Sequence, residues 1–143
     1  MMKISARNIF NGSITQLQPG AVNAEVGVSI GGGNQITAIV TNGSVLSLGL
    51  TVGKDVIVLV KASSVLVLVD SAGYRLSARN SLAGTITDIT DGPVGAEVTI
   101  GLAGGNAVHA TITHNSAVTL GLKKGVPAAA VFKASSVILG IAD

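Results

Sequence analysis

The sequence contains no cysteine, no tryptophan and only three aromatic residues, Phe10, Tyr74 and Phe132. Without cysteine the chain forms no disulfide, has no thiolate to bind a metal and has no cysteine nucleophile. Since hydrophobic residues make up 48% of the chain and aromatic residues only 2%, its core must be built from Val, Ile, Leu and Ala. The scarcity of aromatic rings also argues against a single-stranded nucleic-acid surface, where bases stack on such rings.

Charge is scarce as well. Charged residues make up 11% of the chain, against about 25% in an average soluble domain. A chain this apolar is expected to bury much of its surface in an oligomer. The net charge is only +2, and the longest basic run is Lys123-Lys124. A clustered basic footprint for nucleic acid is therefore missing.

Long hydrophobic segments are missing too. An apolar run such as Val56–Val60 is far too short to cross a bilayer. The N-terminal residues Met1–Ser5 lack the apolar centre of a signal peptide. These features predict a soluble cytoplasmic protein that does not associate with a membrane.

The dominant feature that is present is an internal repeat of 72 residues. Without any gap, 27 of the 67 residue pairs between 3–69 and 75–141 are identical. Ser5-Ala6-Arg7-Asn8 returns as Ser77-Ala78-Arg79-Asn80, and a Lys-Ala-Ser-Ser-Val run returns at 133–137 after 61–65. The chain is therefore a tandem duplication, which we divide into residues 1–72 and 73–143.

The pattern within each copy predicts strands. Apolar and polar residues alternate over 22–30, which indicates a half-buried strand, and Gly31–Asn34 predicts a hairpin loop. In the first copy we expect further strands over 3–10, 13–17, 36–40, 56–60 and 65–69, a turn or bulge at Gly12, and a short helix over 45–48 that Ser44 caps and Gly49 ends. This predicts an all-β fold of two tandem small barrels like those of oligonucleotide-binding (OB) folds, each with one short helix, in an oligomer.

The duplication also selects candidate site residues. Only four charged pairs keep their sign between the copies: Lys3/Arg75, Arg7/Arg79, Glu25/Glu97 and Lys61/Lys133. Serine and asparagine side chains surround the recurring Arg7 and Lys61. One Arg, one Lys, hydroxyl groups and backbone N–H groups suit a tetrahedral dianion such as molybdate, tungstate or sulfate. The Thr41-x-x-Ser44 pair at the expected helix start adds further donors.

These runs, together with Gly12, Gly53 and Leu48-x-Leu50 and their repeats, resemble the molbindins, proteins of two tandem Mop-type domains. The resemblance covers nearly the whole chain. It implies OB-like barrels, cytoplasmic binding of molybdate and also of tungstate, and storage or homeostasis of the anion. It also implies a homotrimer with oxyanion sites at interfaces between Mop domains and a second kind of site near the threefold axis.

In related domains the Ser-Ala-Arg-Asn and Lys-Ala-Ser runs contact the oxyanion, and the Thr-x-x-Ser pair comes from a neighbouring domain. Carried over to this chain, the resemblance assigns molybdate binding to Ser5, Ala6, Arg7, Asn8, Thr41, Ser44, Lys61, Ala62 and Ser63, and to Ser77, Ala78, Arg79, Asn80, Thr113, Ser116, Lys133, Ala134 and Ser135.

Three alternatives remain at this stage: a nucleic-acid-binding OB-like module, an enzyme, and a sensor that acts through a separate regulator. No Ser-His-Asp or paired-carboxylate set recurs in both copies, so we expect no catalytic residues. His109 and His114 have no third ligand beside them in the sequence, and Thr37 and Asn42 replace them in the first copy. We therefore expect no site for a free metal cation.

Overall fold

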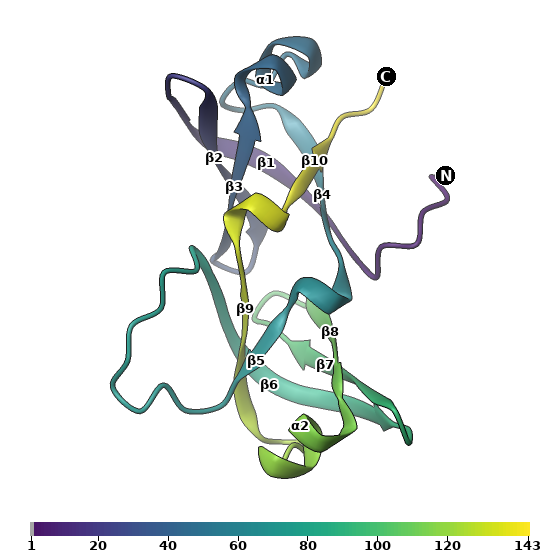
Figure 1. The fold of residues 1–143 in the computed structure, drawn as a ribbon. Helices are drawn as coiled ribbons and strands as arrows, with labels where there is room; N and C mark the ends of the chain where they lie inside the picture. The colour runs from purple at the N-terminus through teal and green to yellow at the C-terminus, as the bar shows by residue number, and fades with distance from the viewer. Residues whose placement is uncertain (1) are drawn as a thin grey trace.

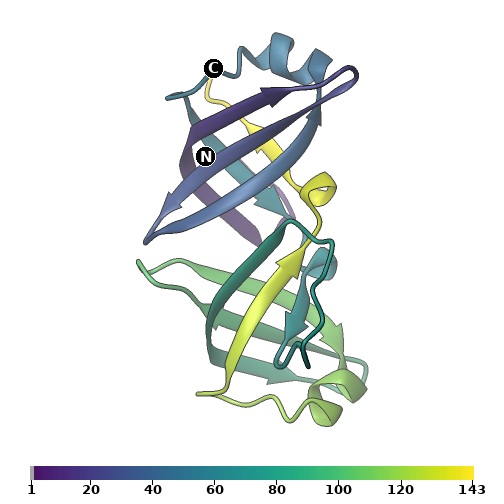
Figure 2. The ribbon, with the colours of Figure 1, turned by 90° about the vertical axis from the view of Figure 1, so that its left-hand side faces the viewer.

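The structure, a computed structural model, describes residues 2–143. Two small β-barrels lie one above the other, and both chain ends lie at the upper barrel (Figure 1). Each barrel is a curled five-stranded sheet (Figures 1 and 2), and the sheet orders are β10-β4-β1-β2-β3 and β5-β9-β6-β7-β8. The predicted all-β class and the tandem barrels are confirmed.

The upper sheet, called the first barrel below, consists of β1 (Asn8–Pro19), β2 (Asn23–Gly31), β3 (Asn34–Thr41), β4 (Asp55–Val60) and β10 (Ile138–Gly140). The second barrel consists of β6 (Asn80–Asp91), β7 (Gly95–Gly101), β8 (Ala107–Thr113), β9 (Pro127–Phe132) and β5 (Leu66–Leu68). The helices are α1 (Asn42–Leu48), α2 (His114–Thr119) and two 3-10 turns, η1 (Ala62–Ser64) and η2 (Ala134–Ser136).

The two barrels exchange their last strands. β10 is the C-terminal strand of the chain, yet it pairs with β4 of the first barrel, with Leu139 opposite Val58. β5 belongs to the first sequence copy but pairs with β9 of the second barrel, with Val67 opposite Ala130. Figure 2 shows each of these strands leaving its own copy across the junction. The division at 72 and 73 therefore describes the sequence repeat, and as a boundary between folding domains it stays a prediction.

The first strand differs from the prediction. Lys3–Arg7 does not form a strand, and one long strand, β1, replaces the two that were expected. Pairing with β4 begins at Asn8, opposite Val60, because the next residue of the partner, Lys61, turns into η1. The Ser-Ala-Arg run is therefore an extended segment that leads into β1, and this places it beside the Lys-Ala-Ser run.

Gly12 lies inside β1, and the bulge comes later, between Ile14 and Gln16. A Cβ at Gly12 would lie 2.5 Å from the carbonyl oxygen of Ser29. The glycine is needed for the close approach of β1 and β2 as the strand bends, and no turn forms there.

The helix prediction needs one correction as well. α1 begins at Asn42, and its N-cap is Thr41, whose side chain accepts the backbone N–H of Ser44. The predicted cap, Ser44, is therefore the residue whose N–H is capped. Gly49 ends the helix in the left-handed conformation, with φ of 62°, as predicted.

The core contains the residue types that the composition requires. Val, Ile, Leu and Ala supply nearly all of the buried apolar side chains, together with Phe10 and Phe132. Tyr74 is 77% exposed and lies in the loop that joins the two copies. Between residues 2 and 143, none of the helices has the length and apolar character that a membrane span requires.

Candidate functional site

The first candidate site is a pocket of about 380 Å³, here called the Arg7 pocket. Two recurring runs line it, Ser5-Ala6-Arg7 and Lys61-Ala62-Ser63. They meet because β1 starts where β4 ends, so the segment before β1 lies next to η1. The structure therefore brings together two runs that lie more than fifty residues apart in the sequence.

The repeat produces a matching pocket of about 360 Å³, here called the Arg79 pocket. Ser77-Ala78-Arg79 and Lys133-Ala134-Ser135 line it in the same arrangement. A wider hollow of about 640 Å³ includes Asn11 and Asp55, but Ala83 and Pro127 stand at these positions in the second copy. The recurring arginines and lysines line the Arg7 and Arg79 pockets.

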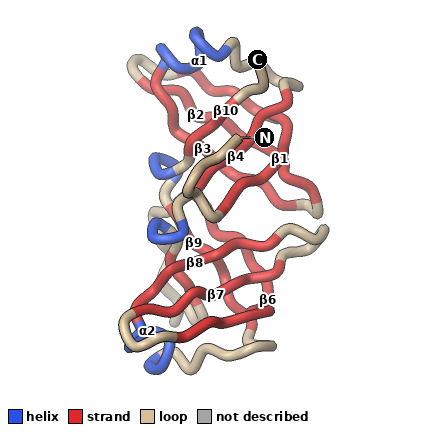
Figure 3. Tube along the Cα trace, turned by 90° about the vertical axis from the view of Figure 1, so that its right-hand side faces the viewer, coloured by secondary structure: helices blue, strands red, loops and turns tan. Residues whose placement is uncertain are grey.

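Each pocket lies where the two barrels meet. Thr111 of β8, in the second barrel, completes the Arg7 pocket. Ile39 of β3, in the first barrel, occupies the matching place in the Arg79 pocket. η1 packs on β8 and η2 packs on β3. Figure 3 shows both 3-10 turns at the level where the barrels meet.

The pockets expose hydrogen-bond donors. Ser5, Lys61 and Ser63 are exposed, while Ala62 is buried and anchors the turn. Lys61 occupies the N-cap position of η1, and its side chain makes no capping hydrogen bond. The first N–H groups of a helical turn have no partner within the turn. Hydroxyl, ammonium and backbone N–H groups therefore converge at one place, and they can all donate to an anion.

The arginines are not isolated cations. Arg7 forms a two-pronged ion pair with Glu97 of β7, with nitrogen–oxygen distances of 2.7 and 2.5 Å. Arg79 forms the matching ion pair across the barrel junction with Glu25 of β2, through one guanidinium nitrogen and one carboxylate oxygen. The hydrogen bond from Arg79 to Glu25, together with the carboxylate charge, raises the pKa of the guanidinium above its ordinary value. Arg79 therefore stays charged, and a carboxylate faces each arginine.

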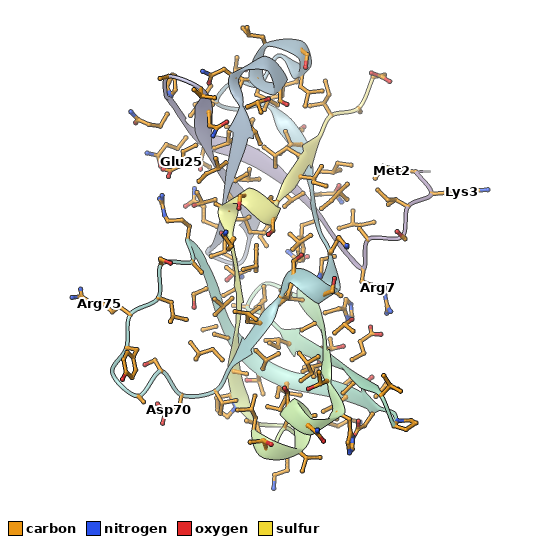
Figure 4. All side chains as sticks on the ribbon, in the orientation of Figure 1. Met2, Lys3, Arg7, Glu25, Asp70 and Arg75 are labelled. Carbon is orange, nitrogen blue, oxygen red and sulfur yellow. The ribbon has the colours of Figure 1, made fainter. Side chains whose placement is uncertain are left out.

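Sequence reasoning did not assign these glutamates to the site. They were among the four charged pairs that recur, and this recurrence was the signal that could have found them. The fourth pair, Lys3 and Arg75, extends away from the body of the molecule (Figure 4). The other three recurring pairs lie together: the arginines and lysines line the two pockets, and the glutamates pair with the arginines.

An ionisable side chain lies beside the Arg7 pocket and has no counterpart beside the Arg79 pocket. His109 of β8 lies with its Nδ1 atom 3.0 Å from Thr99 Oγ1 and 3.7 Å from the Oε1 atom of Glu97. Thr37, at the matching position of the first copy, has no ionisable side chain. An ionisable group therefore lies near Glu97 that has no counterpart near Glu25.

Asn8 and Asn80 have another role in the structure. The Asn8 side chain is 1% exposed, donates to the carbonyl oxygen of His109 at 2.8 Å and accepts the His109 N–H at 2.7 Å. Asn80 bonds both backbone groups of Thr37 in the same way, at 2.8 Å each. These amides join each barrel to a strand of the other, and neither lines its pocket.

The Thr-x-x-Ser pairs lie elsewhere. Thr41 Oγ1 accepts the Ser44 N–H at 3.1 Å and lies 2.9 Å from the Ser44 hydroxyl oxygen. Thr113 and Ser116 repeat this cap at α2. α1 and α2 lie at opposite ends of the molecule, away from the junction between the barrels (Figure 1). One chain therefore does not bring these hydroxyl groups to its own pockets.

The donors of the pockets fit a small oxyanion. Lys and Arg only donate hydrogen bonds, and serine hydroxyl groups can donate as well. Hydrogen bonds to a charged group contribute about 1.5–3 kcal/mol each. A lysine, two serines and backbone N–H groups in one pocket can therefore offset the dehydration of an anion.

Comparison with known proteins agrees with this organisation. The TOBE domain family matches residues 4–67 and 76–139. The molybdenum transport protein ModE of Azotobacter vinelandii is 46% identical over 140 residues, which are 98% of this chain and 52% of the relative. The molybdenum-pterin-binding protein MopA of Rhodobacter capsulatus is 43% identical over 140 residues, 98% of this chain and 53% of MopA. The chain thus spans about half the length of these curated relatives.

One solved structure matches the chain over its full length. It is the cytoplasmic molybdate-binding protein ModG, in a crystal form with molybdate bound. The sequences are 52% identical, the TM-score is 0.96, and the match covers 99% of this chain and 100% of ModG. With both sequence repeats matched, this chain carries two TOBE domains and belongs to the TOBE domain family.

Proposed function

We propose that this chain binds molybdate, and tungstate as a close analogue, in the Arg7 and Arg79 pockets. One observation carries the proposal: a donor-rich pocket recurs in both halves of a chain that is 52% identical to ModG, whose crystal structure holds molybdate. The lysine supplies charge, and the serine hydroxyl and backbone N–H groups supply directed hydrogen bonds. The protein stores the anion or buffers its concentration in the cytoplasm, and it catalyses no reaction.

The oxyanion sites are interface sites in this proposal. Thr41 and Ser44 reach a pocket only when a second subunit supplies them, because α1 and α2 lie at the outer ends of the chain. Large apolar side chains are exposed at the same ends, with Leu46 83% and Val118 63% exposed. Such side chains favour burial against another subunit. We therefore infer a homotrimer in which the Thr-x-x-Ser pair of one subunit completes a pocket of another.

Nucleic acid is not a partner in this proposal. Phe10 and Phe132 are 3% and 1% exposed, so neither ring can stack on a base. The remaining aromatic residue, Tyr74, is exposed but lies in the loop between the two copies. Stacking surfaces for single strands use several exposed rings along a basic groove. A membrane is not a partner in this proposal either.

Titration calorimetry with sodium molybdate tests the assignment. Lys61→Ala combined with Lys133→Ala should weaken molybdate binding at least about tenfold, because each pocket loses its lysine charge and a charge-assisted hydrogen bond. The matched control is Lys123→Ala with Lys124→Ala, which changes the net charge equally at exposed positions outside both pockets. Equal affinity of the two double variants would contradict the proposal.

The arginine assignment is tested in the same assay. Arg7→Ala combined with Arg79→Ala should also weaken molybdate binding, since these side chains line the two pockets. Tight binding that survives this double substitution would show that the arginines serve only the junction between the barrels.

A further inference from the structure

The glutamates that pair with the arginines face the pockets from the opposite barrel. Glu97 lies directly opposite Thr111 in the β7–β8 ladder, and Thr111 lines the Arg7 pocket. Glu25 lies opposite Ile39 in the β2–β3 ladder, and Ile39 lines the Arg79 pocket. Directly opposed residues of an antiparallel pair project from the same face of the sheet. Each carboxylate is therefore held at the edge of a pocket whose other charges belong to the other barrel.

This arrangement changes the charge of the pocket. Arg7 and Lys61 alone would give +2, but the ion pair with Glu97 leaves a net charge of +1, carried by Lys61. The guanidinium group has five N–H donors, and the two-pronged pair uses two of its nitrogens. Arg7 therefore still has N–H groups for a ligand, but its charge is already balanced.

We propose that Glu25 and Glu97 set the charge of the two oxyanion pockets from across the barrel junction and so limit the affinity for dianions. This inference rests on the proposed function. Each pocket then holds a dianion with lysine as its only unbalanced cation, which keeps binding reversible. Because molybdate and sulfate carry the same charge, the glutamates lower the affinity for both equally. Discrimination between them comes from the size and geometry of the pocket.

The test is Glu25→Gln combined with Glu97→Gln. Glutamine keeps an oxygen that can accept from the arginine and removes only the charge. Titration with sodium molybdate at pH 8 should show about threefold to tenfold tighter binding at low ionic strength. The gain should shrink in about 0.5 M sodium chloride, because salt screens the added charge. The affinity for sulfate, titrated at anion concentrations well above those used for molybdate, should rise by the same factor.

Two further double variants separate local charge from other effects. Asp88→Asn with Asp143→Asn adds the same net charge at exposed positions outside both pockets, and it should change molybdate affinity less than about twofold. Glu25→Asp with Glu97→Asp keeps the carboxylates and should retain wild-type affinity. Circular dichroism and urea unfolding of each variant confirm that the fold is kept, which is expected because the glutamates lie in partly exposed ion pairs.

The outcomes are distinguishable. Wild-type protein that binds molybdate, combined with glutamine variants whose affinity is unchanged or weaker, would overturn the inference and leave the proposed function intact. A gain that persists in high salt, or that the Asp88→Asn and Asp143→Asn control reproduces, would overturn it as well. Wild-type protein that binds no molybdate would overturn the proposed function and the inference with it.

Discussion

The amides that join the two barrels give the most quantitative prediction. Asn8 and Asn80 are the buried polar residues of the described chain, each 1% exposed, and each bonds the N–H and the carbonyl group of one residue in the opposite barrel. In Asn8→Ala, the two backbone groups of His109 lose their partners. An unsatisfied group away from water costs about 1–3 kcal/mol. Asn8→Ala should therefore lower the free energy of unfolding by about 2–4 kcal/mol.

Urea unfolding at a fixed protein concentration measures this cost. The concentration must be fixed because association with other subunits raises apparent stability. Asn80→Ala should give a similar loss, since it breaks the matching pair of bonds to Thr37. Asn11→Ala is the matched control, because Asn11 lies in the same strand as Asn8 but is exposed. The control should change stability by less than about 0.5 kcal/mol.

The refuting result is specific. If Asn8→Ala and Asn11→Ala unfold at the same urea concentration with equal slopes, the side chain of Asn8 does not hold the barrels together. If instead Asn8→Ala keeps its stability but loses molybdate affinity, the asparagine contacts the ligand, as the family resemblance implies. The unfolding and titration experiments together therefore separate the two roles of this residue.

Three further substitutions test the fold. Gly32→Ala should cost about 1–3 kcal/mol more than Gly33→Ala. Both glycines have positive φ, but only at Gly32 would a Cβ meet other backbone, 2.0 Å from the carbonyl oxygen of Ala103; equal urea midpoints would contradict this. Leu139→Ala should cost about 2–5 kcal/mol and speed amide exchange in β4, because β10 pairs there. If amide hydrogen exchange became faster only in the second barrel, the pairing of β10 with β4 would be refuted. Thr41→Ala should cost about 1 kcal/mol through loss of the α1 cap, measured by urea unfolding, and Thr41→Ser should recover most of it; an unchanged midpoint for Thr41→Ala would refute the cap.

Local patterns predicted the barrel elements because each strand carries its own signal. The alternation over 22–30 and the glycine loop after it correspond to β2 and its hairpin with β3. The end of α1 at Gly49 was predictable, because few other residues easily adopt the left-handed conformation of this glycine. These features depend on residues a few positions apart, and a single sequence contains all of that information.

The partner of the last strand in each copy was not predictable. β5 and β10 follow matching Lys-Ala-Ser-Ser-Val runs, so either can pair with β4 or with β9 as far as the sequence shows. The choice depends on the direction in which the chain leaves η1 and η2 and on how those turns pack against the opposite barrel. A duplicated chain is ambiguous in this respect, because its two halves offer equivalent partners.

The role of the arginine was only half predictable, for a related reason. The recurring Arg7 and Lys61 indicated an anion site, and the structure places both in one pocket. The partner of Arg7, Glu97, lies 90 residues away in the sequence and in the other barrel. A similar separation in the sequence hid the role of Asn8, whose side-chain amide forms hydrogen bonds with His109, 101 residues away. Contacts between the two copies decide what these side chains do, and periodicity does not show such contacts.

The central claim is that both halves of the chain build oxyanion sites and that neighbouring subunits complete them. Native mass spectrometry of the purified protein, with molybdate and with equimolar sulfate, tests this most directly. We predict a trimer that gains at least two molybdate ions per chain and no sulfate. A monomer, or a trimer that takes up neither anion, would contradict the account and leave the recurring Ser-Ala-Arg and Lys-Ala-Ser runs with a structural role alone.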